Sequence, residues 1–320
     1  MSSPEVPVSH NAPISPPTGP ATGSATGSTT GSTTGPTTGS AAAAADRGGS
    51  GTLQLLGNEL STQFRRLRTW AMLAALALIP ILIGIAIRLV GGSGPGSGPA
   101  FLDQITNNGL FVGLVAMTVA IPLFLPLTVS VVAGDAIAGE ASHGTLRYLL
   151  IAPAGRVRLL VVKYLASAAF CVAGTVTVVL VGTLVGLLLF PTGPVTLLSG
   201  AQVSVGEGLL RLLAIAAYVA VSLWGLAAIG LFFSTLTTVP IGAMAATAIL
   251  AVTAQIIGSI PQLDALHPWL FTDRWLDFAD LLRAPIVWDS FVGNAVLQGA
   301  YIAAFGAAAI VRFVTKDVLS

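Results

Sequence analysis

The ionisable residues of this chain are few, and their types decide which chemistry is available. Charged residues make up 8% of 320 positions. Of the two lysines, Lys163 follows a valine and Lys316 a threonine, so neither belongs to a P-loop, where glycine amides and a lysine hold nucleotide phosphates. His10, His143 and His267 lie far apart in the sequence, and no HExxH or GxSxG motif occurs. We therefore expect no enzyme activity and no cofactor bound by this chain.

One stretch gathers charge between two long apolar runs. Residues 134–163, "GDAIAGEASHGTLRYLLIAPAGRVRLLVVK", contain four of the fourteen basic residues. His143 and Arg147 are four positions apart, as are neighbours on one side of a helix, and Leu146 and Leu149 fall on another side. Pro153 prevents this helix from continuing. The pattern predicts a short helix, then a second helix from residue 154 whose basic residues sit at a membrane surface.

The elements that must position this stretch are membrane spans. Hydrophobic types reach 54%, and the charged fraction lies far below the roughly 25% of soluble domains. A bilayer core of about 30 Å needs about 20 apolar residues in a helix, and lipid forces the backbone to hydrogen-bond within each span. The sequence predicts an all-α integral membrane protein with six transmembrane helices. They are residues 70–90, 110–133, 161–190, 211–233, 239–260 and 290–311.

The distribution of basic residues predicts the orientation. With the N-terminus in the cytoplasm, ten of the fourteen Lys and Arg residues fall on the cytoplasmic face, which agrees with the positive-inside rule and places both termini in the cytoplasm. Residues 134–163 then form the main cytoplasmic loop, because residues 234–238, "STLTT", barely make a turn. A nucleic-acid-binding protein would show clustered basic residues, and here they are separated by apolar runs, so we expect no nucleic-acid partner.

The regions outside the spans divide the chain further. Residues 1–50 are rich in Gly, Ser, Thr and Pro and are predicted to form a disordered cytoplasmic tail, leaving 51–320 as the six-helix transmembrane domain. Residues 53–68 have apolar residues at helical spacing and predict an N-terminal interfacial helix. Residues 267–285, with four aromatic residues among acids, predict a second helix resting at the outer headgroups.

Few polar groups fall within the spans. The basic residues Arg88, Lys163, Arg211 and Arg312 lie near span ends, where they are expected to reach the interface, so an ion-coupled carrier with buried carboxylates is disfavoured. Gln255 is the strongest polar group expected at depth, either as an interhelical hydrogen-bonding residue or as part of a translocation path. Cys171, the single cysteine, is expected to pack in the core. The glycine spacing in "GTLVG" (182–186) carries no weight, because such matches are frequent in glycine-rich spans.

A known pattern occurs in the charged stretch. Glu140, Gly144-Thr145-Leu146, Leu149-Leu150, Pro153, Arg156 and Lys163 resemble in order and spacing the signature of the permease subunit of bacterial ABC-2 type transporters. The resemblance extends to an interfacial helix and six spans. It implies an exporter in the bacterial plasma membrane, with a second permease chain forming a homo- or heterodimer. It also implies a separate ATP-binding subunit that binds the ATP.

In that family the loop after the second span forms a coupling helix that docks on the ATPase. The residues expected to make or position this contact are Glu140, His143, Gly144, Thr145, Leu146, Arg147, Leu149, Pro153 and Arg156. Two alternatives stay open. The stretch could be only a basic loop obeying the positive-inside rule, and the chain could be a membrane scaffold that recruits a cytoplasmic partner without transport.

Overall fold

The computed structural model describes residues 39–90, 108–144, 155–197 and 199–315. The chain divides into two units, Met1–Ala45 and Asp46–Ser320. Only residues 39–45 of the first unit are described, as the start of helix α1 (Gly39–Arg65). The predicted boundary at residue 50 falls inside α1, and residues 1–38 of the predicted tail lie outside the described residues. All contacts below belong to the second unit.

The second unit is helical, and six of its helices are long and apolar enough to cross a membrane. The prediction of an all-α membrane protein is therefore confirmed. The β1 and β2 strands have two residues each and pair antiparallel. The elements after α1 are α2 (Leu67–Val90), α4 (Leu110–Ala120), α5 (Phe124–Ser142), α7 (Arg156–Leu189), β1 (Val195–Thr196), β2 (Gln202–Val203), α8 (Val205–Leu236), α9 (Pro240–Gly258), the 3-10 helices η3 (Pro261–Trp269) and η4 (Asp277–Leu282), and α10 (Asp289–Thr315).

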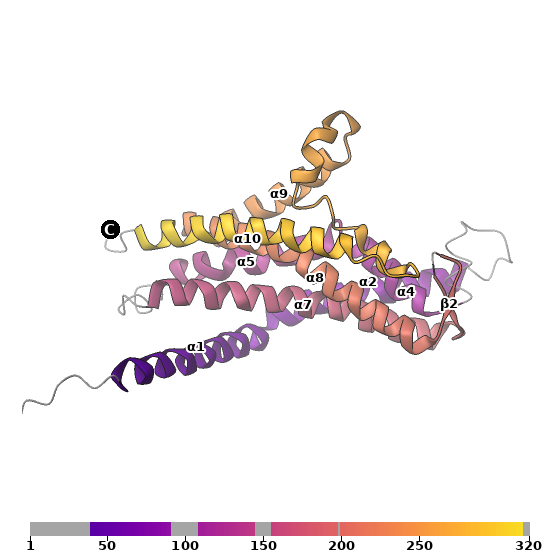
Figure 1. The fold of residues 1–320 in the computed structure, drawn as a ribbon, viewed down its shortest axis with the longest axis horizontal. Helices are drawn as coiled ribbons and strands as arrows, with labels where there is room; N and C mark the ends of the chain where they lie inside the picture. The colour runs from indigo at the N-terminus through magenta and orange to yellow at the C-terminus, as the bar shows by residue number, and fades with distance from the viewer. Residues whose placement is uncertain (1–38, 91–107, 145–154, 198, 316–320) are drawn as a thin grey trace, which may run out of the picture. The chain divides into compact units, whose positions relative to one another are not determined.

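Helix α8 is the centre of the bundle. It packs against α5, α7, α9 and α10, and Figure 1 shows it between α7 and α10. In its apolar stretch 72% of the residues are buried, against 22% for α9 and 17% for α10. The outer two helices therefore present most of their apolar side chains outward, as a helix facing lipid tails does. The connection from α8 to α9 spans only residues 237–239, as the sequence predicts.

The second predicted span is broken into α4 and α5. Residues 110–133 were expected to form one helix, but Ile121 to Leu123 separate two helices. The cause is a proline pair: Pro126 has no N–H, so the carbonyl of Pro122 lacks its helical donor. Gln255 of α9 supplies that donor, with Nε2 2.6 Å from the Pro122 oxygen. Of the two roles expected for Gln255, the interhelical hydrogen bond is therefore observed.

Helices α4 and α7 meet at glycines. A Cβ on Gly109 would overlap the backbone of Gly186, and one on Gly182 would lie 2.6 Å from the Gly113 Cα. Gly109 at the N-cap of α4 and Gly113 within it face Gly182 and Gly186 of α7, and this spacing lets the backbones approach closely. Contrary to expectation, the glycine spacing of "GTLVG" (182–186) contributes to this contact.

Part of the segment between α9 and α10 packs into the bundle. Of the four aromatic residues within 267–285, Phe271, Trp275 and Phe278 are buried and Trp269 is exposed, and no residue of η3 is buried. Its structure consists of the 3-10 helices η3 and η4 and not of one interfacial helix. The prediction of one helix over residues 267–285 is therefore wrong, whereas its position at the outer headgroups stays a prediction. Helical periodicity does not distinguish an aromatic residue that faces headgroups from one that faces a protein core.

Side chains of α8 and α10 hold this segment by its carbonyl groups. Tyr218 donates to the Arg274 oxygen at 2.7 Å, and Gln298 donates to the Phe271 oxygen at 2.8 Å. Arg211 is also buried and donates to the Leu281 oxygen at 2.7 Å, so it does not reach outward as expected of a basic residue at a span end. Residues 271–281 of this segment therefore belong to the packing of α8 and α10.

Two amides on α10 are buried more deeply than expected. Asn294 and Gln298 are 1% and 0% exposed; Asn294 donates to Ser222 at 2.7 Å, and Gln298 donates to Asn294 at 3.2 Å. Gln255 is therefore not the strongest polar group at depth. Cys171 is buried, and its expected place in the core is confirmed.

Candidate functional site

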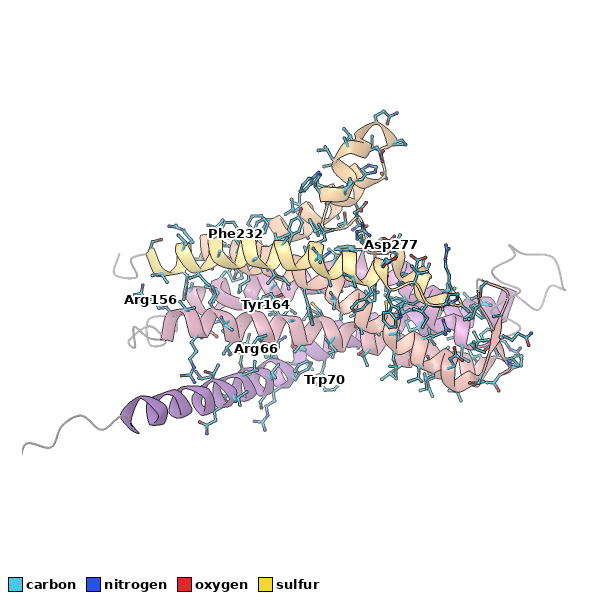
Figure 2. All side chains as sticks on the ribbon, in the orientation of Figure 1. Arg66, Trp70, Arg156, Tyr164, Phe232 and Asp277 are labelled. Atoms are coloured by element: carbon cyan, nitrogen blue, oxygen red, sulfur yellow. The ribbon has the colours of Figure 1, made fainter. Side chains whose placement is uncertain are left out.

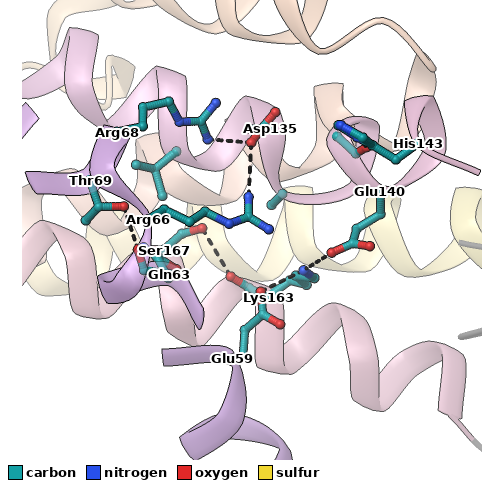
Figure 3. Close-up of a pocket in the computed structure, with 13 residues that line it drawn as sticks. Glu59, Gln63, Arg66, Arg68, Thr69, Asp135, Glu140, His143, Lys163 and Ser167 are labelled. Atoms are coloured by element: carbon teal, nitrogen blue, oxygen red, sulfur yellow. Dashed lines mark hydrogen bonds and ion pairs between the residues drawn. The ribbon is translucent and has the colours of Figure 1, made fainter. Parts of the chain in front are cut away.

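The central contact of the site is the ammonium group of Lys163 on α7. Its Nζ atom lies 2.6 Å from Glu59 Oε1 on α1 and 2.9 Å from Glu140 Oε1 on α5. Figure 3 shows the two carboxylates reaching Lys163 from different helices. One ammonium thus joins α1, α5 and α7. Glu140, a predicted coupling residue, is part of this contact.

The environment of Lys163 differs from the expectation of a snorkelling residue. Its side chain is 5% exposed, because α7 begins at Arg156 and places Lys163 two turns inside the helix. Burying an ammonium group costs several kcal/mol, and only close partners offset that cost. The carboxylates of Glu59 and Glu140, 24% and 20% exposed, provide that compensation while keeping contact with water.

A second charged group lies in the same pocket. Arg68 hydrogen-bonds Asp135 of α5, and Arg66 Nη1 lies 3.7 Å from the same carboxylate. The Asp135 side chain is 14% exposed, whereas those of Arg66 and Arg68 are 50% and 44% exposed. The two groups line a pocket of about 300 Å³ whose walls come from α1, α2, α5 and α7. The pocket lies where α1 ends and α2 begins.

The end of α5 is fixed on two sides. Ser234 of α8 inserts into its hydrogen-bond ladder: it donates to the Gly134 oxygen at 2.7 Å and accepts from the Ala138 amide at 2.8 Å. At the last turn, Gly144 has φ +71° and its N–H donates to the Ala141 oxygen at 3.1 Å. A side chain there would be strained, so this left-handed helix ending explains glycine at 144 without a partner protein.

The predicted site residues fall into three groups. Glu140, His143 and Gly144 lie in or directly after the last turn of α5, and His143 Nδ1 lies 2.7 Å from the Gly139 oxygen. Arg156 lies at the start of α7 and donates to the Val314 oxygen of α10 at 3.2 Å. The remaining five lie outside the described residues. They are Thr145, Leu146, Arg147, Leu149 and Pro153.

Five residues of the site were not among the predicted site residues: Glu59, Arg66, Arg68, Asp135 and Lys163. The available signal was the carboxylate pair Asp135 and Glu140 at the end of an apolar run, since charges near a span need partners. Their basic partners come from helices far away in sequence, and no local pattern identifies them. Within the described residues, no group of three or more His, Cys, Asp or Glu side chains could hold a metal ion.

Six apolar spanning helices with a charged, multi-helix cluster define a multi-pass membrane protein. Comparison with protein families matches residues 53–267 to the family described as ABC-2 family transporter protein. The match covers more than half of the chain, and the chain therefore belongs to the ABC-2 transporter family, as a permease. A search of curated proteins gave no match.

Proposed function

We propose that this chain is the permease subunit of an ABC exporter, driven by a separate ATP-binding subunit that docks on the segment between α5 and α7. The observation that carries the proposal is the position of Lys163. Its contacts with Glu59 and Glu140 lie beside both ends of that segment. A displacement at the segment would thus reach α1, α5 and α7 together.

The proposal includes the setting of the chain. Both termini lie in the cytoplasm of a bacterial cell, and a second permease chain completes the pathway as a homodimer or a heterodimer. ATP is bound by the partner subunit. This part of the proposal is supported by the sequence of this chain, in which neither lysine belongs to a P-loop. Arg65, Arg66 and Arg68 lie where α1 ends and α2 begins, and Arg156 and Arg158 lie in the first turn of α7, in agreement with the positive-inside rule.

Copurification and hydrolysis test the proposal. The full chain, tagged and extracted from its native membrane, should retain a P-loop ATPase identified by mass spectrometry. Leu146→Asp would place a charge in an apolar contact, where an unpaired charge costs about 3–5 kcal/mol when buried. We expect this variant to insert but to lose the ATPase, or to keep it with transport uncoupled from hydrolysis. If Leu146→Asp and Arg147→Glu both assemble and transport as the wild type does, the coupling assignment is wrong.

A variant of Lys163 tests how the movement reaches the bundle. Lys163→Met leaves two carboxylates without their shared cation and should lower the free energy of unfolding by about 1–3 kcal/mol, since both carboxylates keep some water. It should also lower transport per ATP hydrolysed. Lys163→Arg keeps the charge and is the matched control. Normal coupling in Lys163→Met, at wild-type amounts of complex, would exclude the cluster from the coupling path.

The scaffold alternative predicts a different outcome. A recruiting protein would retain its partner but give no ATP-dependent movement of solute across a sealed vesicle. Vesicles reconstituted with the copurified complex, with and without ATP, distinguish the two functions.

A further inference from the structure

The pocket between α1, α2, α5 and α7 has a half that Lys163 does not neutralise. Arg66 and Arg68 share a single carboxylate, that of Asp135. Two guanidinium groups and one carboxylate carry a formal charge of +1. On the other side of the pocket, Lys163 lies against Glu59 and Glu140, and these three groups carry a formal charge of −1. The six groups together are neutral, with one positive charge in excess on the side of Arg66 and Arg68 and one negative charge in excess on the side of Lys163.

Most N–H donors of the Arg66 and Arg68 guanidinium groups have no hydrogen-bond acceptor among the described residues. Arg66 reaches Asp135 only at 3.7 Å, beyond the range of a hydrogen bond, and in the described part of the chain its guanidinium makes no hydrogen bond. Arg68 contacts Asp135 through one nitrogen, Nη2. A guanidinium has five N–H donors in a planar fork that matches an oxyanion. Several donors on Arg66 and Arg68 thus remain for a ligand oxygen.

The position of the pocket defines the type of anion. Its lining includes Arg66, Arg68 and Thr69, where the apolar helix α2 begins. Leu67 and Trp70 lie in the same turn of the chain but outside the pocket lining, and they are 84% and 59% exposed (Figure 2). The Trp70 indole is held by a 2.8 Å hydrogen bond to the Phe64 oxygen, and tryptophan is enriched at the headgroup level of membranes. The outward apolar face of α2 continues from there along the span. It includes Leu78, Leu82, Ile85 and Leu89.

We propose that Arg66 and Arg68 bind the phosphate of a phospholipid headgroup, whose acyl chains lie along the outward face of α2. A phosphodiester carries one negative charge, which equals the excess charge of this half, and arginine binds phosphate oxygens in a forked arrangement. The pocket volume of about 300 Å³ lies at the lower end of the roughly 300–1,000 Å³ of small-ligand sites. Asp135 holds the two guanidinium groups in place and competes with the phosphate.

The carboxylate half of the pocket favours a particular headgroup. Glu59 lines the same pocket as the two arginines, and its side chain is 24% exposed. A headgroup that carries an ammonium beside its phosphate would place opposite charges at both halves. Phosphatidylethanolamine has this arrangement, and its net charge of zero removes any general attraction to a basic surface. It is therefore the probe that separates this site from the positive-inside effect.

The test is native mass spectrometry of the full chain in detergent, titrated with phosphatidylethanolamine. A diacylglycerol with the same acyl chains lacks the phosphate and should bind at least about tenfold more weakly, as expected for the loss of charge-assisted hydrogen bonds. The double variant Arg66→Gln with Arg68→Gln should weaken the lipid by a similar factor. The matched control is Arg65→Gln, which removes the neighbouring charge outside the pocket lining and should change binding less than about twofold.

A variant that is expected to bind the lipid more tightly distinguishes a specific effect from misfolding, because a misfolded chain would bind less. Asp135→Asn removes the competing carboxylate and should tighten the lipid, provided that the variant elutes as the wild type does. The inference is overturned if diacylglycerol binds equally well, if the double variant binds as the wild type, or if Arg65→Gln causes an equal loss. Free phosphoethanolamine that displaces the lipid at an equal concentration would overturn the lipid as ligand in favour of a soluble phosphate compound.

Discussion

Gln298 of α10 occupies space that Gly225 of α8 leaves free. A Cβ on residue 225 would overlap the Gln298 Oε1 atom, which is buried and has no hydrogen-bond partner among the described residues. The amide is nevertheless held in place, since its Nε2 donates to Phe271 and Asn294. The glycine and the buried amide therefore depend on each other, and the contact joins α8, α10 and the segment after α9.

Gly225→Ala should lower the free energy of unfolding by about 1–3 kcal/mol, because an added methyl group in a filled core forces its neighbours to move. The measurement is the thermal unfolding midpoint in detergent. Gly299→Ala on α10 is the control, since nothing lies within 4 Å of its added Cβ, and it should be neutral or stabilising by about 0.5–1 kcal/mol. Equal midpoints for the two variants would show that the fit at Gly225 is loose.

Gly186→Ala tests the close approach of α4 and α7. Its Cβ would overlap the carbonyl of Gly109, and a backbone group cannot rotate away as a side chain can. We expect a loss of about 1–3 kcal/mol in the free energy of unfolding. Gly206→Ala in the first turn of α8, where no atom lies within 4 Å of the added Cβ, should leave the unfolding midpoint nearly unchanged. A Gly186 variant as stable as the Gly206 variant would mean that α4 can move away at little cost.

Trp275 and Trp269 should respond differently to truncation. Trp275 is 2% exposed and donates to the Ser222 oxygen at 3.0 Å, whereas Trp269 is 75% exposed. Trp275→Ala should cost about 3–5 kcal/mol, and Trp269→Ala should cost less than about 1 kcal/mol, as surface substitutions do. Chemical denaturation in detergent micelles measures both. Greater destabilisation by Trp269→Ala than by Trp275→Ala would contradict the packing described for these two residues.

The carboxyl group of Asp277 in η4 should make stability depend on pH. Burial raises its pKa above the ordinary value of 3.8, Arg274 lowers it, and Asp273 and Asp280 raise it further. The folded chain therefore holds this proton more tightly than the unfolded chain. The free energy of unfolding then falls as the pH rises from 3.8 through the raised pKa.

Asp277→Asn removes this dependence. The variant should be more stable than the wild type at pH 7, by less than about 1 kcal/mol because the side chain is 42% exposed and solvent screens it. The difference should disappear below the ordinary pKa of 3.8. Unfolding midpoints at several pH values measure it, and Asp289→Asn is the control. A difference that grows toward low pH would have the wrong sign.

The sequence predicted the spans because their signal is local. About 20 consecutive apolar residues identify a span wherever its neighbours lie, and the stretch 211–233 falls within α8 as expected. The broken helix was missed because Pro122 and Pro126 sit in an apolar run, and hydropathy does not record a missing N–H. The pairing of Lys163 with Glu59 joins residues 104 positions apart, which no periodicity encodes.

The same limit applies to the buried amides. Asn294 and Gln298 are four residues apart in a helix whose other side faces outward, so hydropathy averages them with their apolar neighbours. Their burial depends on Ser222 and Phe271 being close, which is a property of the packed structure. A pair of amides four residues apart in a span was nevertheless visible in the sequence. Such a pair predicts a polar contact with another helix.

The interruption between α4 and α5 determines how the second membrane crossing behaves as a mechanical part. A continuous helix passes twist along its hydrogen-bond ladder, but this one is interrupted from Ile121 to Leu123. Twist applied near Glu140 would be absorbed halfway along the crossing, while α4 stays clamped to α7 at Gly109 and Gly113. The crossing thus consists of two helical pieces that can rotate independently. A force applied at the Glu140 end would be transmitted from α5 to the helices packed against it, α8 and α9.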